Sequence, residues 1–316
     1  MNNILVTAIG SMSAASVLEQ LSSNGDSIVG TDTYPLQWQT NQKFLKKFHQ
    51  VPKAVEERYI EEILKICVDN GVKYVIPLTD PEIDALSANR TMFENKKIVL
   101  CISNPEAISK CRNKSVLEKI FRKVPLVNVI PSLSKEEMDD ETLYPIVAKP
   151  KNGRSSEGLY LLKNRKWLSI IENRDDYVFQ PYIQGQVVTV DVVRDGYGNN
   201  VSVARRELIR TFNGMGVVVE IIEDSALEQI VAVISEKLDI LGCINIEFLK
   251  KDNTCYLMDC NPRFSAGIGF SMFVGYDFVT NHLRCFKNES IGTLVSLKSG
   301  VLFRESKISS IRQEEA

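Results

Sequence analysis

The sequence predicts an α/β N-terminal unit built on a parallel sheet, followed by an α+β part built on antiparallel strands. Two observations carry this prediction. Through the first hundred residues or so, short aliphatic runs alternate with amphipathic helical patterns, which is typical of a parallel sheet covered by helices. Between residues 186 and 222, apolar and polar residues alternate, which is typical of an antiparallel sheet with one covered face.

The N-terminal part is predicted to begin with a strand and then to alternate helices and strands. The strands are the runs NILVTAIG, SIVGTD, KYVIPLTD and KIVLCIS, and the helices lie from about Ser13, near residues 56–69, and between the last two runs. Asn70 and Gly71 end the second helix, because glycine readily adopts the left-handed conformation of a helix C-terminus.

The loop that follows the first strand resembles a phosphate-binding turn. It spans residues 8–13, and Asp32 lies where an acid that binds a ribose would be placed. The three-glycine fingerprint of dinucleotide-binding proteins is absent, however, which disfavours that function.

The middle of the chain predicts a helical stretch and then three strands. Residues 105–123 form one helix or two short ones. The run YPIVAKP is a strand, KNGRSSEG a loop, LYLLK a second strand, and YVFQPYIQG a third strand that ends at Gly185.

In the last third, a helix covers the antiparallel sheet. Ser225 and Glu228 form a capping box at its start. The apolar side chains that follow at helical spacing are Leu227, Ile230, Val231, Ile234, Leu238 and Leu241. The terminal residues SSIRQEEA are expected to be frayed.

Composition excludes several classes of function. A chain of 316 residues with 44% hydrophobic content buries a substantial core, and a net charge of -2 leaves no large basic surface for nucleic acid. No apolar run approaches the roughly 20 residues of a membrane helix, and the first residues read as a strand, not as a signal peptide.

Cysteine and histidine usage points in the same direction. The seven cysteines have no C-x-x-C spacing, so we expect reduced, buried thiols in a cytoplasmic protein. His49 and His282 are the only histidines, which makes a histidine metal centre or a histidine general base improbable.

The segment INIEFLKKDNTCYLMDCNPR is predicted to form a β-hairpin with its turn at residues 251–254. If Glu247 pairs with Asp259, the two carboxylates stand with their Cβ atoms ~5 Å apart, where like charges repel. A divalent cation such as magnesium would then lie between them. The alternative is a hairpin in another register, or a solvated sheet face on which two acids happen to fall.

Two further groups suggest phosphate chemistry. Arg263 follows Asn261 by two residues, and its guanidinium would hold a phosphate or carboxylate with two hydrogen bonds, unless it forms a surface salt bridge instead. Lys149 ends a strand beside a loop that contains glycines and serines, which can approach phosphates closely. The alternative for that loop, Gly153, Ser155, Ser156 and Gly158, is a flexible hairpin turn.

The order of these pieces resembles the ATP-grasp superfamily. A βαβ domain is followed by Lys114, AKPKNGRSSEG, FQPYIQG, INIEF and MDCNPRFSAG. The branch it resembles is a single ATP-grasp unit of the carbamoyl phosphate synthetase large subunit, over roughly residues 3–290. This resemblance implies a Rossmann-like pre-ATP-grasp domain and a two-subdomain ATP-grasp fold. The implied boundaries are 1–110, 111–184 for the lid subdomain, and 185–316 for the subdomain with the metal site.

The resemblance also implies roles for individual residues. Lys114 and Lys149 would contact the phosphates and the adenine side of ATP, and residues 153–158 would be a mobile lid. Adenine would be held at the hinge by Gln180, Pro181, Tyr182 and Ile183. The magnesium ligands would be Glu247, Asp259 and Asn261, and Arg263 would steady the transferring phosphoryl group. The acceptor substrate would lie near Arg205, Ser265 and Gly267. The chain departs from the family pattern at Asn113 and Asp259, where the family more often has an acid and a glutamate.

The implied activity is an ATP-dependent carboxylate-amine ligase that forms ADP and an acyl-phosphate intermediate. Its cofactors would be ATP and Mg2+, or Mn2+ in its place, and its partners small carboxylates and amines, with a homodimer as the assembly. The alternatives are a carbamoyl-phosphate-type kinase or synthetase fragment, and a regulatory protein that binds ATP without catalysis.

Overall fold

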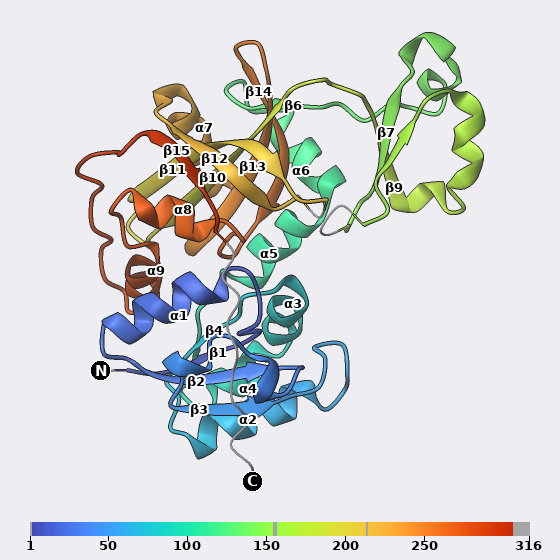
Figure 1. Cartoon of the computed structure of the whole chain (residues 1–316). Coiled ribbons are helices and arrows are strands. Elements are labelled where there is room, and N and C mark those ends of the chain that lie inside the picture. Colours follow the sequence, from blue (N-terminus) through green and yellow to red (C-terminus); the bar gives the residue numbers. More distant parts are fainter. Residues whose placement is uncertain (1, 154–156, 213, 306–316) are drawn as a thin grey trace.

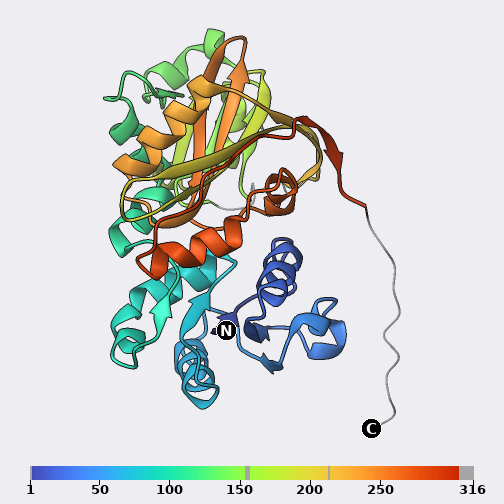
Figure 2. The ribbon, with the colours of Figure 1, turned by 90° about the vertical axis from the view of Figure 1, so that its left-hand side faces the viewer.

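The computed structural model describes residues 2–153, 157–212 and 214–305 of the chain. Figure 1 shows an α/β domain at the N-terminus, a large sheet above it, and a small three-stranded sheet that projects to one side. Figure 2, turned by 90°, shows the same stacking of the large sheet over the N-terminal domain.

The N-terminal sheet has five parallel strands in the order β3-β2-β1-β4-β5. In chain order they are β1 (Asn3–Val6), β2 (Ser27–Asp32), β3 (Lys47–Gln50), β4 (Tyr74–Ile76) and β5 (Val99–Leu100). Successive side chains of a strand face opposite sides, so Ile4 and Val6 enter one core and Leu5 enters another. The sheet is therefore buried on both faces, as parallel sheets usually are. Its strand pairings are all parallel, which confirms the prediction.

Helices cover both faces of this sheet. α1 (Ala14–Ser23) packs on the side of Ile4, whereas α2 (Tyr59–Asp69), α3 (Asp80–Ala88) and α4 (Arg90–Glu94) pack on the side of Leu5. The helix α2 ends where the sequence predicted, because Asn70 caps it and Gly71 has a φ of 59°. Two 3-10 turns, η1 (Leu36–Trp38) and η2 (Gln42–Phe44), lie between β2 and β3.

Asp32 ties together the two loops at the carboxyl edge of β1 and β2. Its Oδ2 accepts a hydrogen bond from the Gly10 amide at 2.9 Å, and its Oδ1 accepts one from the Tyr34 amide at 3.0 Å. Both oxygens of the acid that the sequence marked as a possible ribose ligand are thus used within the protein.

The stretch at residues 105–123 forms two helices, α5 (Pro105–Arg112) and α6 (Lys114–Phe121). Each begins at an asparagine that accepts backbone N–H groups: Asn104 caps α5 and Asn113 caps α6. The apolar faces of both helices pack on the large sheet. α6 therefore belongs to the core of the large sheet. The domain boundaries expected at residues 110 and 184 stay a prediction.

The small sheet has the order β8-β7-β9, all antiparallel: β7 (Ile146–Pro150), β8 (Tyr160–Leu162) and β9 (Tyr177–Pro181). It has its own core around Ile146, Leu162 and Phe179. The 3-10 turns η3 (Glu137–Asp139), η4 (Glu141–Leu143), η5 (Arg165–Ile170) and η6 (Arg174–Asp176) surround it. The prediction that its third strand reaches Gly185 was wrong, because the strand ends at Pro181 and the chain then crosses to the large sheet.

The large sheet has seven strands in the order β15-β12-β11-β10-β13-β14-β6. They are β6 (Asn128–Val129), β10 (Gln186–Arg194), β11 (Asn200–Arg210), β12 (Gly216–Ile222), β13 (Gly242–Lys251), β14 (Thr254–Asn261) and β15 (Gly300–Phe303). Every pairing is antiparallel except that of β6 with β14, which confirms the predicted antiparallel part. The apolar face is covered by α7 (Ser225–Lys237).

The predicted capping box of α7 was wrong. The helix begins at Ser225, and Asp224 is its N-cap, with its side chain accepting a hydrogen bond from the Leu227 amide at 3.0 Å. Asp224 also accepts a hydrogen bond from the Lys250 ammonium at 3.0 Å, which holds the carboxylate in this position.

The chain ends with α8 (Ile268–Phe273), α9 (Phe278–Phe286) and the edge strand β15. All seven cysteines lie within the described residues and are buried free thiols. No helix in the described ranges has the length and apolar character of a membrane span. The predicted fraying of residues 309–316 falls outside the described residues.

α9 docks on the N-terminal domain. Gln20 of α1 donates to Asp277 at 2.9 Å, and Asn24 donates to Thr280 at 2.7 Å. His282 bridges the domains from within the core, because its Nδ1 accepts the Cys243 amide at 2.9 Å while its Nε2–H donates to the Cys101 carbonyl at 3.1 Å. Both ring nitrogens are used, which leaves this histidine no role in proton transfer.

We expect His282 to make the fold sensitive to acid. Burial lowers the pKa of His282 from 6.5 to about 4, so between these values only the unfolded chain takes up the proton. Stability is then complete above pH 6.5 and falls by about 3 kcal/mol as the pH drops to about 4. Denaturant unfolding of the wild type and of His282→Gln over this pH range tests this. Equal slopes of stability against pH in the wild type and His282→Gln would contradict it.

Candidate functional site

The hairpin of β13 and β14 brings two acids face to face, as the sequence predicted. Glu247 lies directly opposite Asp259, and Asn245 lies opposite Asn261. The tight turn pairs Lys251 with Thr254, and continuing that register would place Asp259 opposite Ile246, whose side chain is buried on the other face.

A β-bulge corrects the register. The pairing runs regularly as far as Phe248 with Leu257 and resumes with Glu247 and Asp259, so Met258 is the extra residue. The bulge turns Asp259 to the polar face, where it shares a row of side chains across the sheet with Glu247, Thr189 and Arg205.

Each acid of the pair faces a cation at loose distance. The Lys114 ammonium lies 3.3 Å from Asp259 Oδ2, and the Arg210 guanidinium lies 3.4 Å from Glu247 Oε2. Asn113 places Lys114 by capping the helix that begins with it, a task that an asparagine amide performs as well as an acid would. Burial raises the pKa of Glu247, Arg210 opposes this, and Asp259 adds to the rise.

The polar face fits a divalent cation held together with a phosphorylated ligand. Glu247, Asp259 and Asn261 line one cavity and offer only oxygen donors from their carboxylates and amide, the type that magnesium prefers. Within the described ranges, no group of three or more His, Cys, Asp and Glu side chains is arranged to hold a metal by itself. Ligand oxygens would therefore have to complete the coordination.

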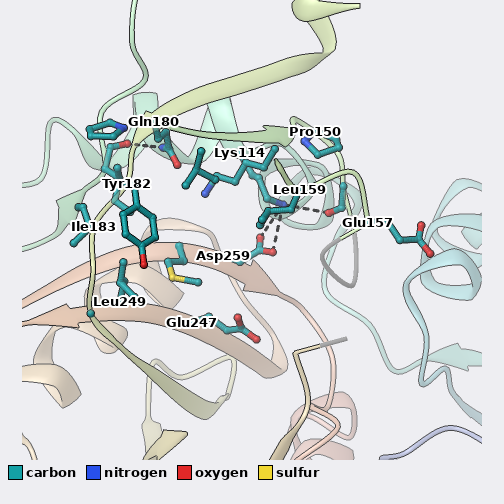
Figure 3. Close-up of a pocket in the computed structure, with 17 residues that line it drawn as sticks. Lys114, Pro150, Glu157, Leu159, Gln180, Tyr182, Ile183, Glu247, Leu249 and Asp259 are labelled. Atoms are coloured by element: carbon teal, nitrogen blue, oxygen red, sulfur yellow. Dashed lines mark hydrogen bonds and ion pairs between the residues drawn. The ribbon is translucent and has the colours of Figure 1, made fainter. Parts of the chain in front are cut away.

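A cavity of about 330 Å3 lies between the small sheet and the large sheet; we call it the lid cavity. Figure 3 shows that one end is charged, with Lys114, Glu157, Asp259 and Glu247, and that the other is apolar, with Tyr182, Ile183 and Leu249. Its further lining includes Ile130, Val147, Lys149, Pro150, Gly153, Leu159, Gln180, Pro181, Gly185 and Met258. The structure thus brings the proposed lysines and hinge residues around one space.

Lys149 reaches this cavity from β7. Its ammonium makes no hydrogen bond with any residue that the structure describes. Burial lowers the pKa of Lys149 from 10.5 to about 8, Asp259 opposes the decrease, and Lys114 adds to it. A buried cation without a hydrogen-bond partner is costly in an empty cavity and favourable beside an anion.

The described residues of the loop after β7 contribute to the charged end. Lys114 donates to the Gly153 carbonyl at 3.2 Å, and Gly153 and Gly158 both pack on the ring of Pro150. Gly158 has a φ of 69°, and a Cβ there would lie 2.9 Å from Pro150, so this position requires glycine. Ser155 and Ser156 fall outside the described residues.

Gln180 is oriented by the protein itself. Its side-chain amide donates to the Ile130 carbonyl at 2.6 Å, as the dashed line in Figure 3 marks. This bond uses the side-chain nitrogen of Gln180, so its side-chain oxygen is the atom that can accept a further hydrogen bond. Pro181, Tyr182 and Ile183 line the apolar end of the cavity.

A second cavity, of about 180 Å3, shares Glu247 and Asp259 with the first; we call it the polar cavity. It is lined by Thr189, Arg205, Glu207, Arg210, Gly214, Met215, Gly216, Asn245, Asn261, Arg263, Ser265, Ala266 and Gly267. The lining includes three arginines and three acids, so an anionic ligand would bind through arginine N–H groups that the acids leave free.

Arg205 and Ser265 line the polar cavity and also belong to a buried network, and their direct contact with a substrate stays a prediction. Arg205 pairs with Asp191 and, at 3.1 Å, with Glu207, and it donates to Ser265 at 3.1 Å. Ser265 in turn donates to Asp191 at 3.0 Å. A Cβ on Gly267 would lie 2.8 Å from the Arg205 guanidinium, so Gly267 makes room for this network.

Arg263 is held by the N-terminal domain. Its Nε and Nη2 donate to the two oxygens of Asp80 at 2.9 and 3.0 Å, and its Nη1 donates to the Phe264 carbonyl at 3.1 Å. Asp80 thus occupies one edge of the guanidinium, and the N–H groups that remain are left for the polar cavity.

Four residues of the two cavities and their surroundings were not predicted from the sequence: Arg210, Asp80, Met258 and Glu157. Arg210 is the last residue of β11, whose other charged residues face both sides of the sheet, and only the folded sheet shows which of them meets Glu247. Asp80 had a sequence signal, because the run LTDPEIDAL places an acid directly after a parallel strand, at the edge where ligands bind in α/β sheets.

Comparison with protein families gives two matches. Residues 4–101 match the model described as PylC-like, N-terminal domain. Residues 173–307 match the model described as ATP-grasp in the biosynthetic pathway with Ter operon.

Three known proteins illustrate the similarity. A carbamoyl phosphate synthase large chain from Agathobacter rectalis is 21% identical over an alignment 207 residues long, and the match covers 59% of this chain and 19% of that protein. The chain therefore spans about a fifth of the length of that curated relative.

The other two are solved structures. One is the biotin carboxylase domain of Hydrogenobacter thermophilus 2-oxoglutarate carboxylase, a dimer in complex with MgADP, ADP and bicarbonate. It has a TM-score of 0.75 and 17% identity, covering 91% of this chain and 70% of that one. The other is N5-carboxyaminoimidazole synthetase from Staphylococcus aureus, with a TM-score of 0.74 and 18% identity, covering 96% and 82%. At this identity they establish a shared fold.

Proposed function

We propose that the chain is an ATP-dependent, ADP-forming ligase that joins a carboxylate to an amine, since residues 4–101 match a PylC-like N-terminal model and residues 173–307 match an ATP-grasp model. One observation carries the proposal: the lid cavity and the polar cavity meet at Glu247 and Asp259. A nucleotide in the first would present its terminal phosphate to an anionic acceptor in the second.

The reaction has two steps. An oxygen of the acceptor carboxylate attacks the γ-phosphorus of ATP, the bond to the β-phosphate oxygen breaks, and ADP leaves. The amine then attacks the carbonyl carbon of the acyl phosphate, loses a proton, and displaces inorganic phosphate. Catalysis of this kind depends on positioning and charge stabilisation, so it needs no histidine base.

In this proposal, Lys149 and Lys114 bind the phosphates at the charged end of the lid cavity, and Tyr182, Ile183 and Leu249 hold the adenine at its apolar end. Glu247, Asp259 and Asn261 would hold Mg2+, or Mn2+ in its place, which supplies positive charge to the phosphoryl oxygens when bound. Arg263, Arg210 and Asn261 line the side from which the acceptor approaches.

The lid at residues 153–158 would exclude water from the acyl phosphate, since Gly153 and Glu157 line the charged end of the lid cavity. We further propose a homodimer, the assembly named for the 2-oxoglutarate carboxylase domain, and a reducing compartment such as the cytoplasm, which suits seven free thiols.

A second candidate acceptor is bicarbonate or carbamate. The similarity to a carbamoyl phosphate synthase large chain supports testing these two acceptors as well. The product would then be a carboxy or carbamoyl phosphate in place of an acyl phosphate.

The test is an ADP-release screen with MgATP, in which amino acids, small carboxylic acids and bicarbonate are each paired with amines, and condensed products are detected by mass. We expect ADP release that depends on a particular pair, with a product equal to the sum of the two less one water. Tight MgADP binding without ADP release or product for any pair would point to a regulatory nucleotide-binding protein and overturn the proposal.

A further inference from the structure

Asp80 lies in the N-terminal domain but contacts Arg263, which lines the polar cavity. It is the first residue of α3, at the carboxyl edge of the parallel sheet, and it is only 6% exposed. Its two oxygens accept both N–H groups on one edge of Arg263, a planar and bidentate arrangement.

The Arg263 guanidinium is gripped on two sides. Asp80 holds Nε and Nη2, and the Phe264 carbonyl holds Nη1. With these contacts its plane is fixed beside Asn261 and Asp259, which line the same cavity. A long arginine side chain would otherwise sample many rotamers, at a cost in entropy when a ligand binds.

Asp80 is itself held from the other side. Arg112, at the end of α5, donates to Asp80 at 2.5 Å and to Asp84 at 2.8 Å. Burial would raise the pKa of Asp80, but Arg263 and Arg112 lower it to about 2, so the carboxylate stays charged. The cluster thus links α3, α5 and the loop after β14.

We infer that Asp80 is a positioning residue: it orients Arg263 so that the free N–H groups of that guanidinium meet the phosphoryl group at the junction of the two cavities. The inference rests on the proposed function. It makes the N-terminal domain part of the phosphoryl site, although none of the side chains described for residues 2–110 lines either cavity.

A role in stability alone would be a weak reason for this arrangement. Buried ion pairs gain little over apolar contacts of the same size, because the charges must be desolvated. Holding the ligand-binding edge of an arginine in place is a task that an apolar pair cannot perform.

The experiment measures binding in two stages, so that the carboxylate substrate need not be known. Isothermal titration gives the Kd of MgADP, and then the Kd of inorganic phosphate for the MgADP complex. The variants are Asp80→Asn, Asp80→Glu, Arg263→Gln and the double variant Asp80→Asn/Arg263→Gln. Thermal melting establishes that each one is folded.

We expect Asp80→Asn to weaken phosphate binding by about tenfold or more while the MgADP Kd changes less than about twofold. Asp80→Glu keeps the charge between Arg112 and Arg263 and should recover part of the loss. In the Arg263→Gln background, Asp80→Asn should have no further effect, because a positioning residue acts only through its partner.

Gln20→Leu is the matched control. It removes another side-chain contact between the N-terminal domain and the rest of the chain, on α9, and should leave both Kd values unchanged. If Asp80→Asn binds phosphate as tightly as the wild type, the inference is wrong. Tighter binding would also overturn it, since Asp80 would then compete with the ligand for Arg263. A wild type that fails to bind MgADP would instead refute the proposed function.

Discussion

Replacing Asp259 with asparagine is expected to slow ADP release by about a hundredfold or more, with the substrate pair found in the screen. The amide keeps the size of the side chain but removes one of the two charges that would hold the cation at the phosphoryl group. It also leaves Lys114, now 3.3 Å from Asp259, without its acidic partner. Steady-state ADP release at saturating MgATP measures the effect.

Asp252→Asn is the control for Asp259→Asn. Asp252 lies in the tight turn of the same hairpin, is exposed, and has a φ of 53°, which asparagine tolerates well. The same change of charge on the same two strands should therefore leave the rate unaltered. Near-normal turnover of Asp259→Asn, or an equal loss in both variants, would refute the role proposed for the acid pair.

The strand and helix patterns were readable from sequence because burial imposes them locally. Leu5 and its neighbours in β1 are buried on both faces, so the strand is a continuous apolar run. In β10, valines alternate with Thr189 and Asp191, which are buried on the polar side of the sheet. The pairing of Glu247 with Asp259 was open, since it depends on one residue, Met258, that bulges out of the ladder. A bulge changes the register without leaving a strong signal in the pattern of apolar residues.

The hydrogen-bond partners of the arginines could not be predicted, because they lie far away in the chain. Arg263 meets Asp80 across 183 positions, and Arg205 meets Asp191 within a network that also involves Ser271. Nothing local to either arginine distinguishes one that lines a cavity with free N–H groups from one whose donors are consumed. Two buried atoms in the polar cavity, Glu207 Oε2 and Thr189 Oγ1, make no hydrogen bond to the described residues, and no sequence pattern marks them.

Lys149→Met is expected to weaken nucleotide binding by about tenfold or more and to remove its dependence on pH above neutrality. In the free protein the pKa of Lys149 is about 8, so the ammonium is mostly charged at pH 7 and mostly neutral at pH 9. Phosphates favour the charged form, and nucleotide binding should then take up a proton. The wild-type Kd for MgADP should rise by about tenfold between pH 7 and pH 9, while that of the variant stays flat.

The same substitution should stabilise the protein without nucleotide. Because the folded pKa of Lys149 lies below its ordinary value of 10.5, the wild type loses stability as the pH falls from 10.5 to about 8, on the order of 3 kcal/mol at pH 7. Methionine fills the space without a charge, so the melting temperature should rise while the further increase on adding MgADP shrinks. Lys163→Met, on an exposed lysine of the same small sheet region, should change neither quantity. A lower melting temperature for Lys149→Met, with unchanged MgADP affinity, would show that the buried ammonium serves the fold and not the nucleotide.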